Sequence, residues 1–224
     1  MKKIFYVYRT ARSRDLINFN KGTEPDHFLY GFNYFQKAGF KVNFSDIAYS
    51  KLNFLKPLLY PIEYLAIKKT SIGFRIDQAV ILLPRLLKSD LIIVAPDSAA
   101  LPILLLKKLK LLNKPIVYIS IGLVNELVSK EASLFTKFYK RLFLEANVII
   151  CHSPIEVTTF IKLQPKLKNR VFFIPFGIDI EYFESQTKEE KFILSVGRDR
   201  SRDYKLLSDK KIRILKIIFF FSTN

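Results

Sequence analysis

A short apolar run that ends in a glycine, with arginines behind it, is the stretch of this sequence best suited to chemistry. Residues 192–196 form the run and Gly197 ends it, which indicates a buried strand followed by a tight turn. Glycine amides, a helix N-terminus near Asp203 and guanidinium groups can together bind the oxygens of a phosphate or diphosphate. The cations concerned are Arg198, Arg200, Arg202 and Lys205. The stretch therefore predicts either an anion site or, equally, a solvated basic loop.

A second run of the same form lies upstream. Residues 171–174 predict another strand, which is closed by Pro175 and Gly177, with Asp179 in the loop behind them. Together the two stretches resemble the interdomain crossing of GT-B glycosyltransferases, in the family 4 or group 1-like set that includes many bacterial cell-surface sugar transferases. The resemblance is carried by PFGID at 175–179 with Phe183, and by SVGRDRSRDY at 195–204.

The resemblance implies a division of the chain and a function. Residues 1–174 would form an acceptor-side, Rossmann-like domain with a parallel sheet, residues 175–190 the interdomain crossing, and residues 191–224 the start of a nucleotide-sugar-binding domain. The donor would be a nucleotide-sugar and the acceptor a cell-surface glycan or a lipid-linked molecule, with no further cofactor and no metal. The donor-binding residues would be Gly197, Arg198, Arg202 and Lys205, and Arg202 would match the family's basic residue.

The C-terminal part departs from this family. Residues 208–224 have no further rhythm of strands and loops, and the pair of glutamates with which the family grips the donor sugar is absent. The sequence therefore indicates a truncation or a change of reading frame, with a strand or a membrane-contacting end as the alternative. It leaves open an alternative function as a non-catalytic protein that binds an acceptor or a membrane. Residues 217–221 would be prone to aggregation unless they are covered.

Apolar runs alternate with helical patterns along most of the chain, which predicts an α/β fold with a doubly wound parallel sheet. The expected strands are residues 4–8, 41–44, 89–95, 116–119 and 147–151. The expected helices are residues 23–39, 101–112, 131–146 and 155–163, the first with Phe28, Phe32 and Phe35 on one face. The loop at 9–15 follows the first strand, where the resemblance implies an acceptor-side turn.

Two carboxylates are candidates for catalysis. Asp97 follows the strand at 89–95, and ligands of open α/β sheets bind at the carboxyl ends of strands, so Asp97 could hold an acceptor hydroxyl or else cap the next helix. Glu126 follows the strand at 116–119 and could be the general base of an inverting transfer, or else a surface glutamate. A retaining transfer would need no such base. His152 could face the cleft or be structural.

Composition narrows the class of partner. Lysine and arginine total 37 against 20 acidic residues, and the net charge of +17 favours an anionic partner such as a sugar phosphate, an anionic lipid or a nucleic acid. A nucleic-acid-binding α/β protein stays open as a less favoured alternative. Nucleic acid is not expected as a partner, because the basic residues are spread along the chain rather than gathered on one module. The single cysteine, Cys151, excludes an intrachain disulfide and fits a cytoplasmic protein. Two histidines and one cysteine at unrelated spacings lack a zinc ligand set.

Residues 50–75 mix bulky apolar and aromatic side chains with cations. Such a surface can enter the headgroup layer of an anionic bilayer, which predicts peripheral contact with the inner face of the cell membrane. The alternative is an ordinary pair of core helices with solvated lysines. Pro57 and Pro61 argue against one long amphipathic helix. The cations are Lys51, Lys56, Lys68, Lys69 and Arg75.

Overall fold

The computed structural model describes residues 1–45, 56–128, 133–180, 182–183, 193–196 and 217–220. The chain divides into two compact units, Met1–Phe183 and Glu184–Asn224. In the second unit, β7 (Ile193–Val196) and β8 (Ile217–Phe220) pair in parallel, from Ile193 opposite Ile217 to Val196 opposite Phe220. The strand expected before Gly197 is thus present, and the apolar run at 217–220 pairs with it.

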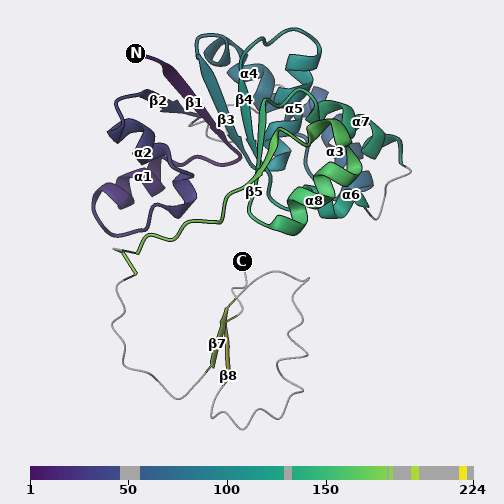
Figure 1. Ribbon diagram of the computed structural model, residues 1–224. Helices are drawn as coiled ribbons and strands as arrows, with labels where there is room; N and C mark the ends of the chain where they lie inside the picture. Colours follow the sequence, from purple (N-terminus) through teal and green to yellow (C-terminus); the bar gives the residue numbers. More distant parts are fainter. Residues whose placement is uncertain (46–55, 129–132, 181, 184–192, 197–216, 221–224) are drawn as a thin grey trace. The chain divides into compact units, whose positions relative to one another are not determined.

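The first unit is built on a parallel sheet of six strands in the order β2-β1-β3-β4-β5-β6 (Figure 1). The inner strands of such a sheet are buried on both faces and read as continuous apolar runs, and this property made them recognisable in the sequence. The expected α/β class with a Rossmann-like parallel sheet is confirmed. The strands are β1 (Lys3–Tyr8), β2 (Lys41–Phe44), β3 (Leu91–Ala95), β4 (Ile116–Ile119), β5 (Val148–Cys151) and β6 (Val171–Phe173).

The strand order reverses between β1 and β3. The chain leaves β1 for the edge strand β2 and then crosses back to β3, which pairs with β1 from Ile4 opposite Leu91 to Tyr8 opposite Ala95. The loops after β1 and β3 therefore leave the sheet in opposite directions. Such a switch point opens a crevice at the carboxyl ends of the strands, and ligands of open α/β sheets bind there.

Helices cover the two faces of the sheet unequally. The larger core packs under α3 to α8 and the smaller core under α1, the 3-10 turn η1 (His27–Leu29) and α2 (Figure 1). Alternate residues of β1 supply the two cores: Phe5 and Val7 point to the larger, Ile4 and Tyr6 to the smaller. The helices are α1 (Ser13–Asn20), α2 (Phe32–Lys37), α3 (Lys56–Thr70), α4 (Ile76–Leu86), α5 (Asp97–Lys108), α6 (Leu123–Val128), α7 (Leu134–Phe143) and α8 (Pro154–Leu163).

One expectation about a helix is wrong. The helix expected over residues 23–39 is broken between η1 and α2, because Tyr30 and Gly31 both have positive φ (50° and 83°). Phe32 is buried, whereas Phe28 is about half exposed, so they do not share one buried face. Helix α3 runs past both of its prolines: Pro57 lies in its first turn, where the missing N–H costs no hydrogen bond, and Pro61 lies on its exposed side. Its apolar and polar side chains are only weakly separated onto two faces, so the expectation that the stretch is not one long amphipathic helix is not contradicted.

Candidate functional site

A cavity of about 600 Å³ lies at the switch point, beside the carboxyl ends of β1 and β3. Its volume is within the range of small-ligand sites, and it brings together the loop after β1, the region of η1, the turn after α3 and the start of α5. The lining residues are Tyr8, Arg9, Thr10, Arg12, Phe28, Tyr30, Ile67, Ser71, Ile72, Gly73, Ala95, Pro96, Asp97, Ser98 and Ile121. The loop at 9–15, expected on the acceptor side, thus contributes directly to the cavity.

A smaller hollow of about 330 Å³ lies at the opposite edge of the sheet. It borders the amino end of β1 and the length of β2, and it carries the exposed cations Lys3, Lys41, Arg85 and Lys88. No buried carboxylate or hydroxyl among the described residues faces it apart from Ser89, whose hydroxyl is already bonded to the carbonyl of Leu86 at 2.7 Å. We therefore place the candidate site at the larger cavity.

Asp97 is the buried carboxylate of the cavity wall. It is the first residue of α5 and only 4 % exposed. Its Oδ1 accepts hydrogen bonds from the Tyr118 hydroxyl of β4 and, at 3.1 Å, from the Ile121 amide, while Oδ2 accepts a longer bond of 3.3 Å from that same amide. The Ser120 side chain also hydrogen-bonds to the carboxylate. Pro96 holds the N-cap position of α5. Asp97 is therefore not a helix cap, as one sequence reading had it, but a link between the ends of β3 and β4.

Burial sets the protonation of Asp97. Removal from water raises the pKa of Asp97 from its ordinary value near 3.8 to about 6, and the hydrogen bonds from Tyr118 and Ile121 oppose this only in part. The negative charge of Glu156 raises the pKa further. Burial and Asp97 together hold the pKa of Tyr118 well above 10, so its hydroxyl stays protonated and donates to the carboxylate. A carboxylate with a pKa near 6 is suited to accept a proton at neutral pH.

Glu156 is a second buried carboxylate, and the sequence reading missed it. It lies in the first turn of α8, is 5 % exposed, and its Oε1 accepts from the Ser120 hydroxyl at 2.6 Å and from the Gly122 amide at 3.2 Å. Ser153 and Glu156 have the spacing of a capping box, and Ser153 does cap α8 by accepting from Ile155. Glu156 instead fixes the loop after β4, the same loop that Asp97 holds from the other side.

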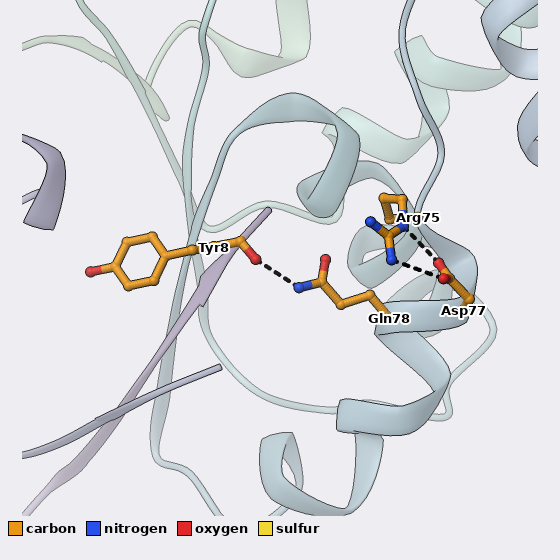
Figure 2. A network of polar contacts seen from close by, with 4 residues as sticks. All are labelled: Tyr8, Arg75, Asp77 and Gln78. Atoms are coloured by element: carbon orange, nitrogen blue, oxygen red, sulfur yellow. Dashed lines mark hydrogen bonds and ion pairs between the residues drawn. The ribbon is translucent and has the colours of Figure 1, made fainter. Parts of the chain in front are cut away.

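Behind the cavity, a polar network at the start of α4 fixes the end of β1 (Figure 2). The guanidinium of Arg75 donates two bonds of 2.9 Å to the carboxylate of Asp77, and both side chains are buried. The Gln78 amide donates to the Tyr8 carbonyl at 2.6 Å (Figure 2), and the Arg75 amide donates to the Ser98 carbonyl at 3.0 Å. The network therefore holds two walls of the cavity in place, and Arg75 is not the surface cation that the sequence suggested.

The cavity wall carries a cation close to two aromatic rings. The guanidinium carbon of Arg12 lies 5.8 Å from the ring centre of Tyr8 and 5.4 Å from that of Phe28. Its Nη1 also donates to Asp15 at 2.6 Å. These contacts hold the side chain in one place, so the cavity offers a positioned positive charge as well as aromatic faces.

The other predicted catalytic residues lie elsewhere. Glu126 is on the exposed side of α6 and is not part of the cavity wall. The structure therefore does not bring Glu126 and Asp97 together in one site. His152 contacts the Ile174 carbonyl through Nδ1 at 2.9 Å and packs against Phe176, which gives it a structural role.

The predicted interdomain residues Pro175, Gly177 and Asp179 belong to the first unit. The Oδ2 of Asp179 accepts from the Asp26 amide at 3.4 Å, and the ring of Phe176 packs against that of Tyr30, a residue of the cavity wall. The segment after β6 thus returns to the region of η1. Gly177 needs no special geometry here, because an added Cβ would meet open space.

The predicted donor residues Gly197, Arg198, Arg202 and Lys205 lie outside the described residues, directly after β7. Within the described parts of the chain, no three histidine, cysteine, aspartate or glutamate side chains form a group that could hold a metal ion. No protein-family model matches the chain, and a search of curated proteins also finds no match.

Proposed function

We propose that the chain is a glycosyltransferase of the GT-B kind, whose first unit binds the acceptor in the cavity between β1 and β3. The observation that carries the proposal is the position of Asp97: a buried carboxylate with a pKa of about 6 in the wall of a cavity at the switch point of a parallel sheet. The resemblance of residues 175–183 and 195–204 to the GT-B crossing supports the same assignment.

The lining of the cavity suits a sugar or another polyhydroxyl acceptor. The Oδ2 atom of Asp97 can accept from a hydroxyl group, and the hydroxyl of Ser98 is buried without a hydrogen-bond partner among the described residues. The aromatic rings of Phe28 and Tyr30 can cover the apolar carbons of a sugar ring. A buried polar atom without a partner is costly, so a ligand hydroxyl that pairs with Ser98 would gain affinity.

In the proposed reaction, the acceptor hydroxyl oxygen forms a bond to the anomeric carbon of the donor while the bond from that carbon to the phosphate oxygen breaks. Asp97 takes the proton of the hydroxyl, as expected of a general base in an inverting transfer. Arg198, Arg202 and Lys205 would neutralise the charge that develops on the departing nucleoside diphosphate. Asp97 replaces Glu126 as the proposed base, because it is the carboxylate that lines the cavity.

The donor side of the proposal predicts stabilisation by one nucleotide. The test is thermal unfolding with a panel of nucleotide-sugars and nucleoside diphosphates. We expect the nucleotides of one nucleobase to raise the Tm of the wild type, because a ligand at 100 times its Kd adds about 2.7 kcal/mol to stability. Arg198→Ala and Arg202→Ala should abolish this shift, whereas Lys166→Ala, which removes an exposed cation elsewhere, should keep it. If no nucleotide shifts the Tm of the folded wild type, a non-catalytic role in binding an acceptor or a membrane replaces the proposal.

A further inference from the structure

Helix α3 exposes a surface that is unusual for a protein in water. Only Ala66 and Thr70 among its described side chains are buried, whereas six large apolar side chains are 45–75 % exposed. We call these six, together with Lys68 and Lys69, the α3 surface; the apolar members are Leu58, Tyr60, Ile62, Tyr64, Leu65 and Ile67. Six exposed large apolar side chains on one 15-residue helix are more than scattered single surface residues, and such exposure marks a surface that binds a partner or a membrane.

Charge is distributed along α3 in an ordered way. Tyr60, Tyr64 and Lys68 follow one another at a spacing of four residues, as do Pro61, Leu65 and Lys69, so that two rows of apolar residues each end in an exposed lysine. Lysines at the end of an apolar row can reach the phosphates of lipid headgroups while their stems stay on apolar surface, and tyrosines favour the same interfacial layer.

The acidic residue of α3 faces away from this surface. Glu63 is half-buried, and its Oε1 lies 3.4 Å from the position that a Cβ on Gly73 would take, which places it towards the body of the first unit. The α3 surface therefore combines exposed apolar side chains and lysines with no exposed acidic side chain of its own helix.

We propose that the α3 surface docks the chain on an anionic membrane. Apolar side chains would enter the boundary of headgroups and acyl chains, and Lys68 and Lys69 would bind lipid phosphates. A second copy of the chain is a poorer occupant of the surface, since each copy carries a net charge of +17 and the two would repel each other. None of the described helices is long and apolar enough to cross a bilayer, so the proposed contact is peripheral.

Docking through α3 would bring the cavity to the membrane. Ile67 belongs both to the α3 surface and to the cavity wall, and the turn that follows α3 lines the cavity with Ser71, Ile72 and Gly73. If the proposed function holds, an acceptor carried on a lipid would reach Asp97 from the headgroup layer. Docking itself does not depend on the reaction, so it can be tested without donor or acceptor.

Flotation of the full chain with lipid vesicles tests the proposal. We expect the protein to float with phosphatidylcholine vesicles that contain phosphatidylserine and to bind far less to phosphatidylcholine alone. Lys68→Gln/Lys69→Gln should weaken binding roughly 30-fold, because each lysine near an anionic membrane surface contributes about 1 kcal/mol to binding. Tyr64→Ser/Leu65→Ser should weaken it at least about tenfold, because less apolar area is buried.

Matched controls separate this surface from general charge or stickiness. Lys166→Gln/Lys168→Gln removes the same charge from exposed positions near η3 (Pro165–Leu167), and Leu134→Ser/Ile155→Ser removes apolar side chains that are 80 % and 73 % exposed on other helices. Both control variants should bind like the wild type. Equal loss in the controls, absence of wild-type binding, or a dimer that the α3 variants dissociate would each overturn the proposal.

Discussion

Replacing Arg75 by methionine is expected to lower the free energy of unfolding of the first unit by about 3–5 kcal/mol. The side chains of Arg75 and Asp77 are both less than 10 % exposed and share two bonds of 2.9 Å. Figure 2 shows the pair. Without Arg75, the buried carboxylate of Asp77 loses its compensating charge. Its loss of hydration on folding is then no longer offset by an ion pair. Urea unfolding at constant pH measures the change directly.

The double variant Arg75→Met/Asp77→Leu is the informative control. Replacing both charges by apolar groups removes the uncompensated carboxylate, so most of the lost stability should return. Arg85→Met, which changes an exposed arginine of the same helix, should stay within about 0.5 kcal/mol of the wild type. A double variant as unstable as Arg75→Met would contradict the explanation, because the cost would then come from packing rather than from the unpaired charge.

Asp97→Asn is expected to stabilise the fold at pH 7 by about 3 kcal/mol, although it removes the proposed base. The folded state raises the pKa of Asp97 from about 3.8 to about 6, so the folded protein binds the proton more tightly than the unfolded chain. Ionisation of Asp97 therefore lowers the free energy of unfolding, and the whole of this decrease is present above about pH 6. This cost disappears as the pH falls from 6 towards 3.8, and an asparagine never incurs it.

Urea unfolding of both proteins between pH 7.5 and pH 4.5 checks this expectation. The difference in stability between Asp97→Asn and the wild type should shrink steadily as the pH falls through 6. Glu126→Gln makes the same chemical change at an exposed position outside the cavity wall and is the matched control. A difference between Asp97→Asn and the wild type that is independent of pH would show that the carboxylate titrates near its ordinary value, and would remove the reason to regard Asp97 as a base.

The strands and the position of Asp97 could be predicted because each depends on local sequence. A strand of a doubly covered parallel sheet is a continuous apolar run, and a residue directly after such a run must lie at the carboxyl edge. The break at Tyr30 and Gly31 was not predictable from the spacing of the phenylalanines, since it depends on backbone conformation. The continuity of α3 past Pro61 depends likewise on the solvent exposure of that side of the helix.

The partners of buried charges could not be predicted, because they come from distant parts of the chain. Glu156 has the spacing of a capping residue, but its contacts are Ser120 and Gly122, 36 and 34 residues away. Arg75 stood among lysines in a basic, apolar stretch, and only the packing of α4 shows that Asp77 pairs with it. Two buried carboxylates, Asp97 and Glu156, hold the loop after β4. The sequence predicted Asp97 as a site residue but not Glu156.

Transfer of labelled sugar from a panel of nucleotide-sugars to isolated cell-envelope material tests the central claim most directly. We predict that the wild type and Glu126→Gln transfer label from one donor, at a rate that rises as the pH passes through about 6. Asp97→Asn should lower the rate at least about 100-fold, in a protein that is more stable than the wild type at pH 7. Transfer by Asp97→Asn at the wild-type rate, or no transfer from any donor by the folded wild type, would contradict the assignment of Asp97 and of the cavity.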